Sequence, residues 1–345
     1  MYPFYLGIDL HLKRTYMVLM NSSGEVIDER RISNNELNQY LEKKVPHSTY
    51  AVMEATRNWA FMYDQLVHHV ERVDIAHPKE LVAISSAAVK ADRIDAKVLA
   101  NLARLNYLPV AYAAPKEIRD LRMGVRHRDQ LVRLRTQAKN RIHAILASYN
   151  LVPSVSDLFG LKGRQFLAEV LEVELRSAAR RVVQDNLDLI EHLNQQIKAL
   201  ESEMVLTPEQ EQTIRLLKTV PGVGRVIAIT ILAEIGDIQR FNSPKALCNW
   251  AGLTPKVRSS DLLVRHGRIS KQGSSLLRAA MTRAATIASR TSKRWYLVHD
   301  GLVLRCGKQA AKVAVARRLL TVVYFMLKRK QPYQENYQRC QPNAR

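Results

Sequence analysis

The first third of the chain alternates short apolar runs with helical patterns. The apolar runs predict strands and lie at 4–8, 16–20, 26–32, 49–53 and 73–76. The turn residues between 22 and 25 predict a hairpin between the second and third of these runs. The helical patterns lie at about 58–69, 79–88 and 92–105. Strands that alternate with helices indicate an α/β domain with a mixed sheet covered by helices, and we expect it over residues 1–114.

The segment 115–206 changes to a long, charged and helical pattern. Apolar residues recur every seven positions from Val183 to Met204, with the polar Asn186 on the same stripe. This spacing predicts a short coiled-coil seam on a helix from about 182 to 205. The seam can pack within the chain or against another subunit, and we favour the subunit contact.

The last third, 207–330, is expected to be mostly helical. Thr207 and Pro208 have the cap and first-turn chemistry of a helix start. A stretch rich in glycine and serine, 252–275, interrupts the helical pattern. The tail 331–345 is polar and contains prolines, so we expect it to be disordered.

Composition points to a polyanionic partner. The chain has 345 residues with 53 Lys plus Arg against 32 Asp plus Glu, a formal charge of +21. Nucleic acid is the usual partner of such a protein, because binding to phosphates releases condensed counterions. The three cysteines have no zinc-site spacing, and no signal peptide or membrane helix is evident, so we expect a cytoplasmic protein that does not contact a membrane.

Four acids in the first third are the candidate metal ligands. Asp9 and Glu54 each end a predicted strand, and Asp92 and Asp95 are three residues apart on one side of a predicted helix. Carboxylates gathered in this way are ligands that Mg²⁺ prefers, and two such ions can assist displacement at a phosphodiester. Each acid alone is more typical of a solvated surface charge or a helix cap.

Three further segments are candidate nucleic-acid contacts. The turn Pro221-Gly222-Val223-Gly224 before an apolar helix is typical of a helix-hairpin-helix clamp on a DNA backbone, or of a tight turn between packed helices. The basic helix within 122–141 is typical of a backbone-binding surface, or of a solvated face, through Arg122, Arg126, Arg128, Arg133, Arg135, Lys139 and Arg141.

The third segment, 251–280, sets serines among cations. Its serines include Ser259 and Ser260, and its candidate phosphate-binding cations are Arg258, Arg265, Arg268, Lys271 and Arg278. A serine hydroxyl in such surroundings can attack a phosphate whose developing charge the cations stabilise. Each serine alone is also an ordinary turn residue.

Taken together, these segments resemble the DEDD transposases of bacterial insertion sequences, the "one-hundred-and-ten" family, which includes the Piv-type DNA invertases. The resemblance covers about 4–330. The motifs that carry it are GIDLH at 7–11, MEAT at 53–56, KADRIDAK at 90–97, LKTVPGVG at 217–224, NWAGLTP at 249–255 and ISKQGSSLLR at 269–278.

The resemblance implies a RuvC-like, ribonuclease-H-type N-terminal domain whose metal-binding acids are Asp9, Glu54, Asp92 and Asp95, with Mg²⁺ or Mn²⁺ as cofactor. It also implies a coiled-coil segment and a C-terminal transposase domain with a nucleophilic serine. Counting from GLTP places this serine at Ser260, and counting back from ISKQG places it at Ser259. Asp261 stands where the family usually has glycine.

The family further implies donor and target DNA as substrates, a dimeric or tetrameric assembly, and in many members a structured bridge RNA. Base pairing to that RNA would supply sequence recognition while the protein contacts backbone and shape. We therefore predict a DNA recombinase in which Ser260 attacks phosphorus and the acids assist. The alternatives are a metal-dependent junction nuclease that uses water, and a nucleic-acid-binding protein without catalysis.

Overall fold

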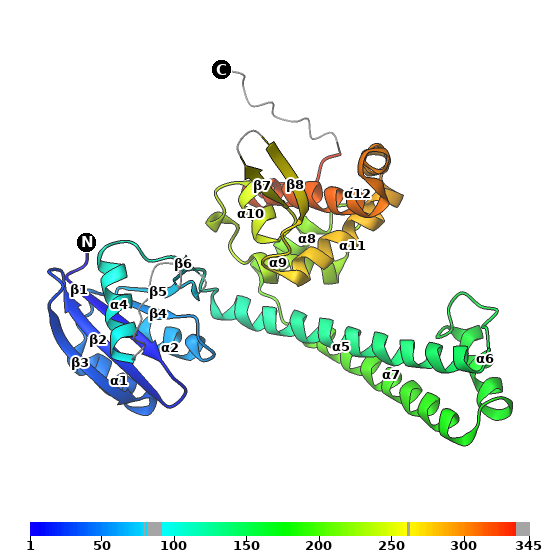
Figure 1. Cartoon of the computed structure of the whole chain (residues 1–345), viewed down its shortest axis with the longest axis horizontal. Coiled ribbons are helices and arrows are strands. Elements are labelled where there is room, and N and C mark those ends of the chain that lie inside the picture. Colours follow the sequence, from blue (N-terminus) through cyan, green and yellow to red (C-terminus); the bar gives the residue numbers. More distant parts are fainter. Residues whose placement is uncertain (79, 82–91, 261–262, 336–345) are drawn as a thin grey trace, which may run out of the picture. The chain divides into compact units, whose positions relative to one another are not determined.

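The chain forms two compact units, Met1–Ala113 and Ala114–Arg345, each with its own hydrophobic core. Figure 1 shows the computed structural model, which describes residues 1–78, 80–81, 92–260 and 263–335. The side chains of 257–266 also lie outside the description. None of the helices in these ranges is long and apolar enough to cross a membrane.

The first unit contains a mixed sheet with the strand order β3-β2-β1-β4-β5-β6. Strands β1, β4 and β5 run parallel, whereas β2, β3 and β6 are antiparallel to their neighbours. The strands are β1 (Phe4–Leu10), β2 (Arg14–Asn21), β3 (Val26–Ser33), β4 (Thr49–Glu54), β5 (Arg72–Ala76) and β6 (Val110–Ala111). The predicted mixed α/β arrangement is confirmed. Strand β1 continues two residues beyond the predicted run, so that Asp9 lies within it.

Helices cover both faces of this sheet. The helices of the unit are η1 (Asn34–Glu36), α1 (Leu37–Lys44), α2 (Trp59–Leu66) and α4 (Asp92–Arg104). Helices α1 and α2 pack on one face against residues such as Leu6 and Ile8. Helix α4 packs on the other face against residues such as Tyr5 and Val52. Because both faces of the central strands β1 and β4 are buried, consecutive positions on these strands are apolar.

Some elements of the first unit do not follow from the sequence pattern. Helix α1 has eight residues and was not among the predicted helices. Strand β6 has two residues, which give no pattern at all. Of the helix predicted at 79–88, position 79 and positions 82–88 lie outside the described residues.

The second unit begins with two long helices that lie side by side (Figure 1). They are α5 (Lys116–Ser148) and α7 (Ser177–Glu203), and the shorter α6 (Leu161–Val173) packs with them. The predicted seam residues Val183 and Ile190 are buried against α5 of the same chain. Met204 instead follows the end of α7 and packs against the C-terminal core. The seam is therefore filled within the chain, by α5, rather than left for the subunit contact we favoured.

The rest of the second unit is a helical bundle with a small hairpin. Its elements are α8 (Pro208–Leu217), α9 (Arg225–Ile235), η2 (Ile238–Arg240), α10 (Pro244–Trp250), β7 (Pro255–Ser260), β8 (Leu263–Ile269), α11 (Ser275–Thr291) and α12 (Lys293–Arg329). The core is built around α9, whose residues from Ala228 to Ile235 are all buried. The predicted helical character is confirmed. The stretch 252–275 contains the β7–β8 hairpin, which its largely polar sequence does not indicate.

The first residues of the predicted disordered tail are tied to the helical bundle. Tyr333 accepts a hydrogen bond from the indole nitrogen of the buried Trp295 at 3.0 Å. Its backbone nitrogen donates to the hydroxyl of Thr219 at 2.9 Å. The tail from 336 onward lies outside the described residues.

Candidate functional site

Two of the candidate acids lie side by side at the carboxyl ends of parallel strands. Ile8 of β1 pairs with Met53 of β4, so Asp9 and Glu54 are the next residues on each strand. Ile8 and Met53 both belong to the core beneath α1 and α2. Because side chains alternate between the faces of a sheet, Asp9 and Glu54 are directed to the opposite face, which α4 covers.

Helix α4 brings the other two acids to the same face. Asp92 and Asp95 lie in its first turn, on the side that continues into the buried Ala96 and Leu99. The helix approaches β1 closely at Gly7, where a side chain would overlap the carbonyl oxygen of Ala96. Glycine at this position therefore permits the contact between α4 and the sheet. All four acids consequently belong to one face of the first unit.

The shortest contacts around these acids involve a histidine, His11. Nε2 of His11 lies 3.2 Å from Oδ2 of Asp9 and 3.4 Å from Oδ1 of Asp92. One ligand atom from each of these three residues lies within 4.8 Å of the other two. The second oxygen of Asp92 lies 3.4 Å from Nη2 of Arg31 on β3. Two carboxylates thus converge on one imidazole nitrogen. Together these three groups form a donor set that fits a divalent metal ion.

The burial of Asp9 and the negative charges near it favour the binding of a cation. Burial raises the pKa of the Asp9 carboxyl, and the negative charges of Asp92 and Asp95 raise it further, while His11 acts in the opposite direction. The side chain of Asp9 is 18% exposed, compared with 37% for Asp92. A cation bound at this position would offset both the lost hydration and the repulsion among the carboxylates.

Glu54 and Asp95 stand further from this centre. Neither belongs to the group of three whose ligand atoms meet within 4.8 Å. Glu54 is partly buried and Asp95 is exposed, and the charge of Asp95 reaches Asp9. The structure therefore brings Asp9 and Asp92 together directly and keeps the other two acids beside them.

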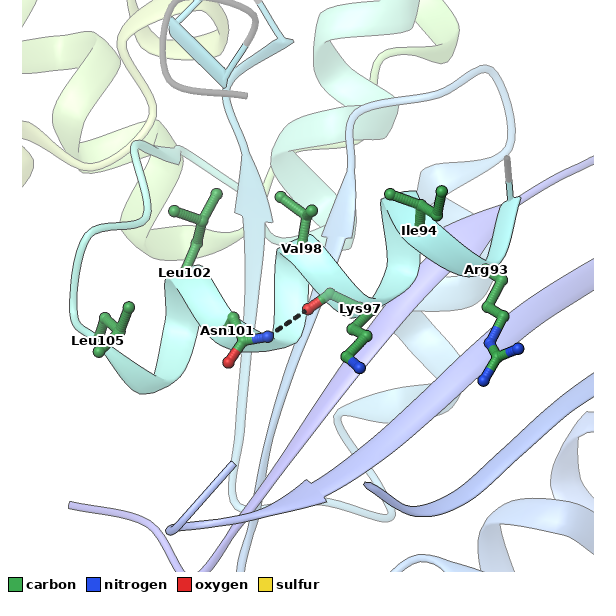
Figure 2. Close-up of a pocket in the computed structure, with 7 residues that line it drawn as sticks. All are labelled: Arg93, Ile94, Lys97, Val98, Asn101, Leu102 and Leu105. Atoms are coloured by element: carbon green, nitrogen blue, oxygen red, sulfur yellow. Dashed lines mark hydrogen bonds between the residues drawn. The ribbon is translucent and has the colours of Figure 1, made fainter. Parts of the chain in front are cut away.

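An open depression on α4 is separate from the acids. Figure 2 shows it on the outer side of the helix, where Ile94, Val98 and Leu102 follow one another at successive turns beside Arg93 and Lys97. This depression has a volume of about 640 Å³ and contains none of the four candidate acids. Arg93 also pairs with Glu29 of β3 at 2.9 Å, which helps to hold α4 against the sheet edge.

The two candidate serines lie at the end of β7. In the hairpin, Ser259 pairs with Val264 and Ser260 pairs with Leu263. Asp261 lies outside the described residues, as do the side chains of both serines and of Arg258 and Arg265. The backbone alone therefore places both serines next to the hairpin turn.

The base of this hairpin is fixed by backbone contacts. The nitrogen of Ser270 donates to the carbonyl of Thr254 at 2.9 Å, and that of Lys271 donates to Gly252 at 3.2 Å. Arg278 donates to the carbonyl of Ala251 at 2.9 Å, so this candidate phosphate ligand supports the hairpin base. Arg268 and Lys271 are exposed.

The Pro-Gly-Val-Gly turn joins α8 to α9. Gly222 has a φ of +82°, and a side chain there would overlap the carbonyl oxygen of Ala284 on α11. Gly224 is the N-cap of α9, with nothing within 4 Å of the position of a side chain. The first glycine therefore serves packing between helices, as the tight-turn alternative expects, while the second leaves the start of α9 open.

Several arginines of α5 contact other parts of the second unit. Nε of Arg122 donates to the carbonyl of Ala233 at 2.9 Å. Arg126 holds the carboxylate of Glu234 through two hydrogen bonds, of 2.9 and 3.1 Å. Glu234 is 1% exposed, so this pair links α5 to the core helix α9.

The remaining basic residues of α5 are divided between contacts and solvent. Arg128 pairs with Glu201, and Arg135 donates to Asn194 at 2.8 Å, both on α7. Arg133 pairs with an aspartate four residues earlier, and Lys139 lies over a phenylalanine ring. Arg141 is exposed. Much of this basic stripe thus has partners within the unit, which the count of charges along the helix could not reveal.

The sequence pattern identified the acids but not their neighbours. His11 and Arg31 contact the acids in the structure and were not among the candidate site residues. His11 lies two residues after Asp9 in the GIDLH motif, which was the available signal. Arg31 comes from a strand two positions away in the sheet, and nothing in its local sequence distinguishes it.

Known proteins match the chain over both units. A family described as "Transposase", DEDD_Tnp_IS110, matches residues 6–151, and one described as "Transposase IS116/IS110/IS902 family" matches residues 214–299. The transposase for insertion sequence element IS1111A of Coxiella burnetii is 24% identical over 95% of this chain and 90% of its own length. The pilin gene-inverting protein of Moraxella bovis is 25% identical over 82% of this chain and 81% of its own length.

The acid-bearing α/β unit and the helical unit therefore define a DNA transposase of the DEDD class, an enzyme for which a divalent metal is expected. More particularly, the chain belongs to the IS110 family of insertion-sequence transposases.

Proposed function

We propose that this transposase cuts and rejoins DNA through a serine nucleophile, Ser260 or its neighbour Ser259, with the help of a divalent metal at the four acids. The observation that supports the metal site is the convergence of Asp9 and Asp92 on one point, beside Glu54 and Asp95. A bound Mg²⁺ or Mn²⁺ would supply Lewis acidity and neutralise charge at a phosphodiester.

The serine step conserves the energy of the phosphodiester. The serine oxygen forms a bond to phosphorus and gives up its proton, and the bond from phosphorus to one DNA oxygen breaks. That oxygen takes a proton and leaves as a hydroxyl. Attack by another DNA hydroxyl on the phosphoserine reverses these changes and joins a new strand. The exchange balances without an external energy source.

The exposed Arg268 of β8 and the exposed Lys271 shortly after this strand would stabilise charge on the phosphate. We assign the same role to Arg258 and Arg265, and a DNA-backbone role to the open start of α9 at Gly224. The +21 charge supports extended contact with nucleic acid, and we propose that this includes a bridge RNA that pairs with donor and target DNA. A dimer or tetramer would bring two DNA sites together.

The test is capture of a covalent protein–DNA adduct. The full chain is incubated with element-end DNA, any RNA from the element's non-coding end, and Mg²⁺, then denatured and resolved by mass. We expect an adduct with the wild type and with Ser259→Ala, and none with Ser260→Ala. An adduct that survives in Ser260→Ala and disappears in Ser259→Ala would reassign the nucleophile.

The same experiment separates the hydrolytic alternative. A junction nuclease also needs the acids but uses water as nucleophile. DNA cleavage that persists in the Ser259→Ala/Ser260→Ala double variant, with no adduct in any sample, would favour that activity. Asp9→Asn should abolish cutting under either mechanism.

A further inference from the structure

We propose that His11 is a nitrogen ligand of the metal site and shifts its preference from Mg²⁺ toward first-row transition ions such as Mn²⁺. The inference rests on the proposed function, in that the acids must bind a divalent metal. It adds a residue that the four-acid pattern does not include, and it makes the choice of metal a property of this chain.

The first support is the position of one atom. Nε2 of His11 faces both Asp9 and Asp92, at 3.2 and 3.4 Å from their carboxylate oxygens. Two adjacent ligands of an octahedral ion, each bound at about 2.1 Å, are about 3.0 Å apart. The two N–O separations are therefore close to those of adjacent ligands of one ion. The nitrogen needs only a small movement to coordinate an ion placed between the carboxylates.

The second support is the way the backbone of His11 is fixed. Its nitrogen donates to the carbonyl of Arg14 at 3.2 Å. Its carbonyl accepts one hydrogen bond from the side-chain amide of Asn34 and one from that of Asn58, both at 3.0 Å. Asn34 is itself held by the hydroxyl of Thr15 at 2.6 Å. Two asparagines from distant parts of the sequence thus hold the backbone at this position.

These contacts also make the residue suitable for substitution. The hydrogen bonds from Asn34 and Asn58 and to Arg14 involve only the backbone of His11, so they survive when the imidazole is removed. The side chain is 51% exposed and leaves no cavity in the core. His11→Ala should therefore keep the fold of the first unit.

The chemical consequence follows from the donor types. Carboxylate oxygens suit Mg²⁺ and Mn²⁺ alike, whereas an imidazole nitrogen is a softer donor that suits transition ions. Adding one nitrogen to a carboxylate site should therefore strengthen Mn²⁺ binding more than Mg²⁺ binding. Loss of His11 should leave an all-oxygen site in which the difference between the two ions is smaller.

The experiment titrates the metal-free full-length protein with Mn²⁺ and measures free Mn²⁺ by electron paramagnetic resonance. Mg²⁺ is then added as a competitor, and pulsed resonance is used to detect ¹⁴N coupling to bound Mn²⁺. The variants are His11→Ala, Asp9→Asn and the control His68→Ala, which removes an exposed histidine of the same unit.

We expect His11→Ala to weaken Mn²⁺ binding about tenfold or more and to lower the Mn²⁺-to-Mg²⁺ affinity ratio. The ¹⁴N coupling should be present in the wild type and in His68→Ala, and absent in His11→Ala. If Mn²⁺ binding requires Asp9 but His11→Ala changes neither affinity nor spectrum, the role of His11 is refuted and the metal site stands. If Mn²⁺ binding is absent or unaffected by Asp9→Asn, the proposed metal site itself is wrong.

Discussion

Arg126 offers a test of whether the basic face of α5 serves DNA binding or packing. Its guanidinium makes two hydrogen bonds to the carboxylate of Glu234, which is 1% exposed on α9. In Arg126→Met the aliphatic stem remains, but the buried carboxylate loses this partner. We expect the second unit to be destabilised, because a buried charge without its counterion is costly.

The magnitude follows from the exposure of the two groups. Breaking a fully buried ion pair costs about 3–5 kcal/mol. The side chain of Arg126 is 59% exposed, so water can replace part of its interaction, and we expect about 2–3 kcal/mol. For a unit of this size that corresponds to a fall of roughly 5–10 °C in the unfolding midpoint.

The assay combines thermal unfolding, followed by circular dichroism, with DNA binding measured by fluorescence anisotropy. The matched control is Arg133→Met, because Arg133 pairs on the same helix with Asp129 and is 65% exposed. This control should cost no more than about 0.5 kcal/mol. Adding Glu234→Gln to Arg126→Met should recover part of the loss, since it removes the buried charge. If Arg126→Met unfolds within about 1 °C of the wild type and loses DNA affinity instead, the packing role is refuted.

Two further substitutions test the geometry of the acidic site. Gly7→Ala should lower the free energy of unfolding by about 1–3 kcal/mol and weaken Mn²⁺ binding, because the new methyl group overlaps the backbone of α4 at Ala96. Thermal unfolding and Mn²⁺ titration measure these effects. The control is Gly301→Ala, which should cost no stability because nothing lies within 4 Å of the new methyl group. Asp9→Asn should stabilise the metal-free protein at neutral pH, because burial and the nearby acids raise the pKa of Asp9 and make its ionised form unfavourable in the fold. A raised pKa means that the folded wild type gains stability as pH falls, so the advantage of Asp9→Asn should shrink toward acid pH; urea unfolding at several pH values measures it, and a less stable Asp9→Asn at pH 7 would contradict the expectation.

The sequence pattern predicts the elements that carry the four acids because the relevant signals are local. The runs before Asp9 and Glu54 predict two strands, and parallel strands place their ends at one edge of a sheet. The three-residue spacing of Asp92 and Asp95 is meaningful on any helix. The approach of that helix to the sheet depends on Gly7, whose role is visible only when the carbonyl of Ala96 is seen against it.

The hairpin and the basic helix show where local signals end. Strands β7 and β8, which carry and follow Ser259 and Ser260, form by pairing with each other. Their polar sequence lacks the alternation of apolar and polar residues that would predict a strand. The sequence of α5 indicates a stripe of charged residues available for DNA, but α7 and α9 supply hydrogen-bond partners for several of these arginines. These partners are more than fifty residues away in the sequence, so the pattern of residues within α5 does not reveal them.

The sequence by itself determined the family, most of the strands and helices of the first unit, and the acids at or near the ends of two strands, because periodicity and motif spacing act over a few residues. Only the tertiary structure decided that His11 faces Asp9 and Asp92, that the heptad seam of α7 is filled by α5, and that Arg126 holds a buried carboxylate. Each of these three contacts depends on which groups, distant in sequence, are buried together or lie at the same edge of the sheet. That is settled by packing of the whole unit and not by any one segment.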